Sequence, residues 1–144
     1  MATENIMSGT RSNAYLSDGT LRYRPANEGT AQRWLFVDDK GVIKSATAQL
    51  LAGKVDINAR ACGVDIPSAL VPVSLQLANW AQKIVFLDQQ SYDAFAEVFK
   101  DYQVDVRSAQ AKSVTVDLDN TYFYMQYDLI NLLKQALPEL VPNA

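Results

Sequence analysis

The chain has 144 residues, a formal net charge of −3 and 49% apolar residues, which is enough for one domain with a substantial core. The negative balance argues against nucleic acid as a partner, and no apolar run approaches the ~18 residues that span a membrane. There is no histidine and one cysteine, Cys62, so an intramolecular disulfide is impossible. We expect neither a metal nor another cofactor.

Residues 1–32 differ in composition from the rest, because they are rich in Gly, Ser, Thr and Asn and poor in apolar side chains. Within them, residues 15–23 fit a small hairpin around a Ser-Asp-Gly-Thr turn. Two interpretations stay open here: a floppy tail, or an arm that docks on a protein partner or a neighbouring copy. The candidate contacts of the arm are Tyr15, Leu16 and Tyr23. We therefore divide the chain into an arm, 1–32, and a folded domain, 33–144.

The first residues lack a basic segment followed by an apolar one, which a secretory signal requires. We expect the protein to act in the cytoplasm, free or inside an assembled particle, and not to be secreted.

A buried strand, a tight loop and a helix open the folded domain. Residues 34–37, Trp-Leu-Phe-Val, form an unbroken apolar run typical of a strand buried on both faces. The polar turn 38–41 follows, and residues 45–52 then predict a helix that ends at Gly53. A loop that leads into a helix N-terminus presents unpaired N–H groups, which favour an anion.

The rest of the chain continues this alternation. Period-two patterning predicts a strand at 55–62, an apolar run predicts a strand at 81–88, and Val114-Thr115-Val116 begins a fourth strand. Helical spacing joins Leu70, Val73, Leu77 and Trp80. Ser91 is the expected cap of a helix whose apolar stripe is Tyr92, Phe95, Val98 and Phe99, and 101–112 is expected to be a surface connection. The last helix spans about 126–137, with Leu129, Ile130, Leu132, Leu133, Ala136 and Leu137 inward.

This order predicts a three-layer α/β fold, in which helices flank a four-stranded parallel sheet with right-handed crossovers. Ligands of such sheets bind at the carboxyl ends of the strands.

The segment after the first strand resembles the phosphate loop of the low-molecular-weight protein tyrosine phosphatases. That family shows Leu-Phe-Val-Cys, five residues, then Arg-Ser; here Leu-Phe-Val is followed by Asp38, five residues, Lys44 and Ser45. The resemblance implies that Asp38 replaces the nucleophilic cysteine and Lys44 the phosphate-binding arginine. Gly41 stands where the family has an asparagine, usually left-handed. The degenerate loop comprises Asp38, Asp39, Lys40, Gly41, Val42, Ile43, Lys44 and Ser45.

These replacements bear on catalysis. A carboxylate does not substitute for a low-pKa thiolate nucleophile, and a lysine does not hold phosphate with two parallel N–H bonds as arginine does. The resemblance also aligns the family's general acid with Asn120, which cannot donate a proton in that way. The former general-acid region is Asp119, Asn120 and Tyr122. Cys62 is expected to be a packing residue.

Residues 117–121, Asp-Leu-Asp-Asn-Thr, also fit the first motif of the haloacid dehalogenases. In that interpretation Asp117 is the nucleophile and Asp119 an acid, with Mg²⁺. Only 23 residues follow Thr121, which leaves little room for the later motifs of that family.

For the loop itself we expect Asp38 to accept the N–H bonds that would otherwise hold phosphate, and to pair with Lys44. The loop would then be a self-filled turn that binds no phosphate. The competing hypothesis is that Lys40 and Lys44 still bind a phosphorylated ligand.

We therefore expect a pseudophosphatase: a phosphatase-like domain without catalysis, repurposed for protein binding or assembly, as in a phage particle or a regulatory complex. The alternatives are a sensor module for an anion or small ligand, and a phosphohydrolase of the haloacid-dehalogenase type. Residues 1–32 are the expected contact element. Tyr124 and Tyr127 are further candidate contacts, although packing is the favoured role of the aromatic run 122–127.

Overall fold

The computed structural model describes residues 31–119 and 121–142. Tyr15, Leu16, Tyr23, the rest of 1–30 and Asn120 lie outside the described residues. Four parallel strands form one sheet in the order β2-β1-β3-β4. The strands are β1 (Arg33–Asp38), β2 (Asn58–Gly63), β3 (Lys83–Phe86) and β4 (Ser113–Thr115).

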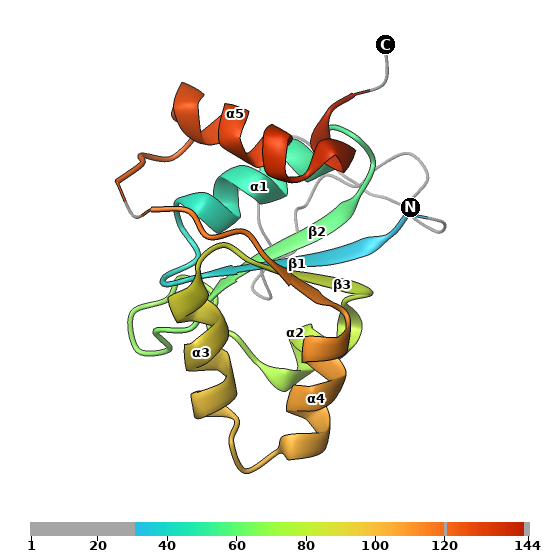
Figure 1. The fold of residues 1–144 in the computed structure, drawn as a ribbon, viewed down its shortest axis with the longest axis vertical. Helices are drawn as coiled ribbons and strands as arrows, with labels where there is room; N and C mark the ends of the chain where they lie inside the picture. The colour runs from blue at the N-terminus through green and yellow to red at the C-terminus, as the bar shows by residue number, and fades with distance from the viewer. Residues whose placement is uncertain (1–30, 120, 143–144) are drawn as a thin grey trace, which may run out of the picture.

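Helices cover both faces of this sheet, as Figure 1 shows. One face carries α1 (Lys44–Gly53), α5 (Tyr127–Ala136) and the short helix η1 (Pro138–Leu140). The opposite face carries α2 (Leu75–Trp80), α3 (Gln89–Val98) and α4 (Gln103–Ala111). The predicted three-layer fold is confirmed. No helix within the described ranges is long and apolar enough to cross a membrane.

The central strand β1 supplies both halves of the core. Trp34 and Phe36 face α1 and α5, while Leu35 and Val37 face α2, α3 and α4. All four side chains are buried, which explains why the run shows no alternation between apolar and polar residues. The two layers of helices hold β1 rigidly, so the residue at its carboxyl end has a fixed position.

Two predicted element boundaries are wrong for local reasons. Residues 103–111 form helix α4 instead of a surface connection, because Val106 and Ala109, three positions apart, bury themselves against the sheet. Strand β2 begins at Asn58 rather than at residue 55, since a turn with Asp56 at a φ of 62° precedes it.

Three predictions about helix faces and caps also fail. The helix expected to include Leu70 is the short α2, capped by the Ser74 hydroxyl, and the Leu70 side chain is exposed. Asp88, not Ser91, caps α3: its carboxylate accepts the N–H of Ser91 at 2.7 Å. In α5, Leu129 and Leu133 are buried as expected, but Ala136 is exposed.

Candidate functional site

Asp38 ends β1 and lies inside the loop that leads to α1. Its side chain is only 3% exposed. One carboxylate oxygen, Oδ1, accepts the N–H of Gly41 at 2.5 Å, and the other, Oδ2, accepts the N–H of Ser45 at 3.0 Å. The expected self-filled turn is therefore present, with the carboxylate taking N–H groups of the loop and of the first turn of α1.

Gly41 makes this geometry accessible. Its φ is +77°, which is in the left-handed region that glycine adopts without a steric cost. The left-handed conformation expected at this position is thus observed.

Two opposing effects act on the Asp38 carboxyl. Burial raises its pKa, while the N–H bonds from Ser45 and Gly41 and the charge of Lys44 lower it, and the net result is a raised pKa. The hydroxyl of Ser45 lies beside this carboxyl, yet its Oγ is buried without a hydrogen-bond partner of good geometry. The ionised Asp38 is therefore held by backbone dipoles rather than by a cation in direct contact.

Lys44 turns away from Asp38. Its Nζ lies 2.7 Å from Oδ2 of Asp88 and donates to the carbonyl of Leu118 at 3.0 Å. The expectation that Lys44 pairs with Asp38 is wrong, because the side chain reaches across the end of β1 to Asp88, at the start of α3. Both members of this ion pair are nearly buried.

Asp88 is thus the counter-ion of Lys44, which is the only buried cation of the site among the described residues. Burial raises its pKa, but the hydrogen bonds from Lys44 and Ser91 outweigh that effect and hold the pKa below its usual value. A single carboxylate thus caps α3 and neutralises Lys44.

The remainder of the loop is more open. Asp39 and Lys40 are exposed and form an ion pair at 2.9 Å, and Lys40 also reaches Asp65 at 3.4 Å. A cavity of about 270 Å³ lies at the loop, lined by Asp38, Asp39, Lys40, Val42, Ile43, Lys44 and Tyr122. Tyr122 is thus brought to the loop, whereas Asp119 is exposed and does not line the cavity.

The aromatic run after β4 divides into two parts. Tyr122 packs partly against the core, but Phe123 is 77% exposed, Tyr127 is 75% exposed and Tyr124 is about half exposed. The N–H of Met125 donates to the Thr47 hydroxyl at 3.0 Å, which holds this segment beside the first turns of α1. The favoured packing role therefore applies to Tyr122 and is wrong for Tyr124 and Tyr127.

Sequence reasoning missed two residues of the site, Asp88 and Gly63. An aspartate directly after an apolar strand is a signal for a helix cap, but nothing in the sequence names Lys44 as its partner. Gly63 packs against the loop backbone so closely that a Cβ there would lie 2.5 Å from the carbonyl carbon of Lys40.

Cys62, next to Gly63, is fully buried in the core. Burial and the neighbouring charge of Asp38 raise the pKa of its thiol. The thiolate is therefore suppressed, as the packing role expected for this residue requires.

Several known proteins resemble this chain in structure. No family model and no curated protein sequence matches the chain. Solved structures do match: a mutant of the YwlE arginine phosphatase with a phosphorylated active-site serine shares 20% identity at a TM-score of 0.54, covering 76% of this chain and 95% of that one. The fold is that of the low-molecular-weight phosphatases.

Two further phosphatases match nearly the same share of this chain. Wzb of Vibrio vulnificus, in complex with benzylphosphonate, has a TM-score of 0.54 with 9% identity and coverages of 76% of this chain and 94% of its own. The Erwinia amylovora tyrosine phosphatase AmsI has a TM-score of 0.55 with 10% identity and coverages of 77% and 91%. The resemblance stated from the loop residues is thus confirmed at the level of the fold. In this phosphatase-like fold, residues 39–43 connect β1 to α1.

Proposed function

We infer that this phosphatase-like domain performs no phosphatase chemistry and instead binds a protein partner or takes part in an assembly. The observation that carries the inference is the Asp38 carboxylate, which accepts the N–H groups of Gly41 and Ser45. In a phosphatase loop those groups would serve the phosphate.

The loop also lacks the reactive groups that a phosphatase of this type uses. A carboxylate stands where the resemblance places the thiolate, and the thiol of Cys62 is buried with a raised pKa. Lys44, which stands at the arginine position, is committed to Asp88. Moving it to an incoming phosphate would leave Asp88 buried without its partner, which costs several kcal/mol, about 3–5.

An anion sensor is disfavoured by the charges of the cavity. A phosphate entering it would meet Asp38 and Asp39, and the only exposed cation among its lining residues, Lys40, is already paired with Asp39 and Asp65. Like charges at such distances oppose binding.

A haloacid-dehalogenase role is disfavoured as well. Oδ1 of Asp117 accepts the N–H of Gln89 at 3.1 Å, at the start of α3. This carboxylate acts as a second support of that helix, and the exposed Asp119 does not line the cavity.

Support for a binding role comes from the apolar surface beside the loop. Val42 is exposed and lines the cavity at the loop, and the exposed Phe123, Tyr124 and Tyr127 come soon after Tyr122, which lines it as well. Exposed aromatic side chains are common anchors of protein interfaces. Residues 1–32 stay a second predicted contact element, and a cytoplasmic site of action, free or within an assembled particle such as a virion, belongs to the same proposal.

An NMR titration with inorganic phosphate tests the inertness of the loop. We expect the amide signals of Gly41 and Ser45 to stay unshifted, and p-nitrophenyl phosphate to remain unhydrolysed. Saturable shifts of these amides at low millimolar phosphate, or turnover that is lost in the Asp38→Ala variant, would show that the loop still acts on phosphate.

Capture from the native source tests the binding role. Full-length protein is compared with the Phe123→Ser/Tyr127→Ser variant and with a version that lacks residues 1–32, and retained proteins are identified by mass spectrometry. A partner lost with either change assigns the contact to that element. The same set of proteins retained by all three would contradict the proposed contacts.

A further inference from the structure

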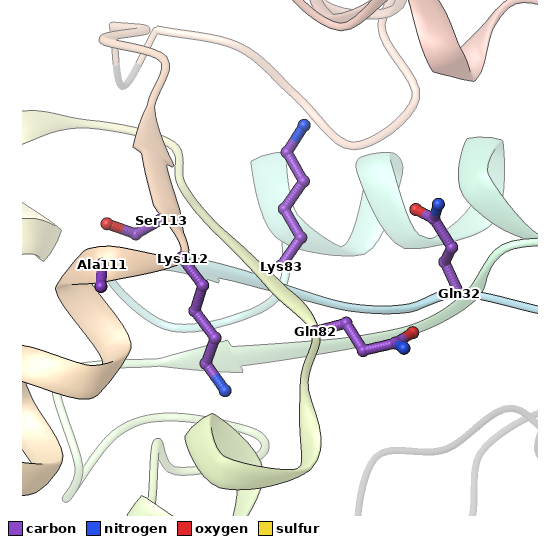
Figure 2. A pocket seen from close by; sticks show the side chains of 6 residues that line it. All are labelled: Gln32, Gln82, Lys83, Ala111, Lys112 and Ser113. Atoms are coloured by element: carbon purple, nitrogen blue, oxygen red, sulfur yellow. The ribbon is translucent and has the colours of Figure 1, made fainter.

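The amino-terminal edge of the sheet, where β1, β3 and β4 begin, carries a second open cavity. Its volume is about 460 Å³, and it is lined by Gln32, Gln82, Lys83, Ala111, Lys112 and Ser113. Figure 2 shows these residues gathered where the strands start, with the side chains of Lys83 and Lys112 pointing to opposite sides of the sheet. This edge lies at the opposite end of the strands from the loop of Asp38.

The two glutamines of this cavity present donors to it. Oε1 of Gln32 accepts the indole N–H of Trp34 at 2.8 Å, and Oε1 of Gln82 accepts the backbone N–H of Arg33 at 2.9 Å. Each amide oxygen already accepts one bond within the protein, whereas the NH₂ group of each glutamine can only donate. The orientation of the two amides is thus fixed by bonds within the protein.

The charged groups at this edge are donors too. Arg33 donates through Nε to the carbonyl of Trp80 at 2.7 Å, and Lys112 donates through Nζ to the carbonyl of Ala81 at 2.5 Å. These bonds satisfy the end of α2, but a carbonyl does not neutralise a full positive charge. Burial and the nearby charge of Arg33 lower the pKa of Lys112, as unneutralised neighbouring cations require.

Among the described ion pairs, one carboxylate pairs with a cation of this edge. Glu139 lies 3.4 Å from the Nζ of Lys83, and its side chain is half exposed. Lys83 also lies over the ring of Trp34, with its Nζ 4.4 Å from the ring centroid. Arg33, Lys83 and Lys112 still have N–H groups beyond those used in these bonds, and with the two glutamine NH₂ groups they form a donor surface. Since the two lysines point apart, an extended acidic surface satisfies them better than one small anion.

The carboxyl-terminal edge of the sheet carries the complementary, negative charge. Exposed or half-buried carboxylates gather there around the loop and the starts of α3 and α5: Asp39, Asp65, Asp117, Asp119 and Asp128. The one exposed lysine of the loop is Lys40, which is shared between two of them. Phe123 and Tyr127, both exposed, lie in the same region and add apolar area.

We propose that the amino-terminal edge of one copy, through Arg33, Lys83, Lys112 and Gln82, binds the acidic carboxyl-terminal edge of a second copy. The contact joins different surfaces of the two copies, so it is heterologous and extends head to tail. Nucleic acid fits the donor surface less well, because the chain as a whole is negative at −3. The inference goes beyond the proposed function, since an inert loop does not require a second copy.

Sedimentation velocity of the full chain tests the proposal with neutralising variants. Lys83→Gln/Lys112→Gln removes the positive charge of one edge, and Asp39→Asn/Asp119→Asn removes carboxylates of the other. We expect the native chain to associate reversibly at 20 mM salt and to dissociate at 500 mM, because the Debye length falls to a few ångströms at the higher salt concentration. Each double variant alone should associate at least about tenfold more weakly.

Mixing the two variants gives the sharpest result. Each retains one native edge, so an equimolar mixture should form a one-to-one complex that cannot grow further. Gln82→Glu provides a gentler check, because its carboxylate still accepts the N–H of Arg33 but replaces the free donor with an acceptor. The matched control, Lys100→Gln/Arg107→Gln, removes the same charge from exposed positions of the helical layer and should associate like the native chain.

A native chain that stays monomeric at several hundred micromolar in low salt would overturn the proposal. So would a control that weakens association as much as the edge variants, or a mixture that forms no complex. None of these results would alter the phosphate titration, so failure here is distinguishable from failure of the proposed function.

Discussion

The two edges of the sheet handle charge in opposite ways. At the carboxyl-terminal edge, Asp38, Lys44 and Asp88 are buried, and every one of them has a partner within the protein. At the amino-terminal edge, Arg33, Lys83 and Lys112 are partly exposed, and the bonds that they make within the protein use only part of their N–H groups. The charges of one edge are neutralised within the protein, whereas those of the other are balanced only in part by Glu139.

Helix direction explains the signs. Helices α1 and α3 begin at the carboxyl-terminal edge, where the positive ends of their dipoles favour the carboxylates of Asp38 and Asp88. Helices α2 and α4 end at the opposite edge, beside Arg33 and Lys112. The fold therefore supplies an anion site at one edge, and in this chain a side-chain carboxylate fills it.

The largest expected effect comes from breaking the buried pair. Asp88→Ala leaves Lys44 buried without its counter-ion and removes the cap of α3, so we expect unfolding to become easier by about 3–5 kcal/mol. Urea denaturation followed by circular dichroism measures this change.

The matched change at the other edge is Glu139→Ala. It removes a carboxylate from an exposed pair with Lys83 and should cost at most about 1 kcal/mol. Equal losses for the two variants would mean that the edges do not differ in the way described.

Close packing of the loop gives the next effect. Gly63→Ala places a Cβ 2.5 Å from the carbonyl carbon of Lys40 and 2.6 Å from the carbonyl oxygen of Asp39. Because both contacts are backbone atoms, the loop must shift, and we expect a loss of about 1–3 kcal/mol. The amide signals of Gly41 and Ser45 should move with it in an NMR spectrum.

Gly53→Ala is the same chemical change at the end of α1, where an alanine suits the helix. It should leave stability unchanged or raise it by up to about 1 kcal/mol. A similar loss at both glycines would show that the close approach at Gly63 is unimportant.

The sequence was sufficient for the fold and for only part of the site. Apolar runs at 34–37 and 84–87 are buried on both faces, so the parallel sheet could be predicted from them. Gly41 and Asp38 could be predicted because their roles are local to one turn. The partner of Lys44 could not, since Asp88 lies 44 positions away and is reached only after β1 and β3 pair.

Amphipathic signals also failed where they were weak. Helix α4 buries only Val106 and Ala109, which is too sparse a pattern to distinguish a helix from a polar connection. The donor surface at the amino-terminal edge has no sequence pattern, because its residues come from the starts of three different strands.

Acid titration should separate the two buried carboxyls. Ionised Asp38 costs stability above its raised pKa, and this cost disappears as the pH falls through that pKa toward 3.8. Asp88 contributes stability above 3.8, which is lost as the pH falls through its lowered pKa. Side-chain carboxyl ¹³C shifts should therefore place the Asp38 midpoint above 3.8 and the Asp88 midpoint below it. Midpoints for both residues on the same side of 3.8 would contradict the difference in their surroundings.

The amino-terminal edge should respond at the alkaline end instead. Charged Lys112 costs stability below its lowered pKa, so this cost is relieved as the pH rises through that value toward 10.5.

The smallest effect on stability is expected from the exposed aromatic residues beside the loop. Phe123 and Tyr127 have about three-quarters of their surface in solvent, so Phe123→Ser/Tyr127→Ser removes little buried area. We expect a change within about 0.5 kcal/mol in urea denaturation. The comparison is with Phe95→Ala, in which a side chain 1% exposed is removed from the core and about 3–5 kcal/mol should be lost. A loss above 2 kcal/mol for the double variant would show that Phe123 and Tyr127 stabilise the fold, and would contradict the proposal that they serve as contacts for a partner.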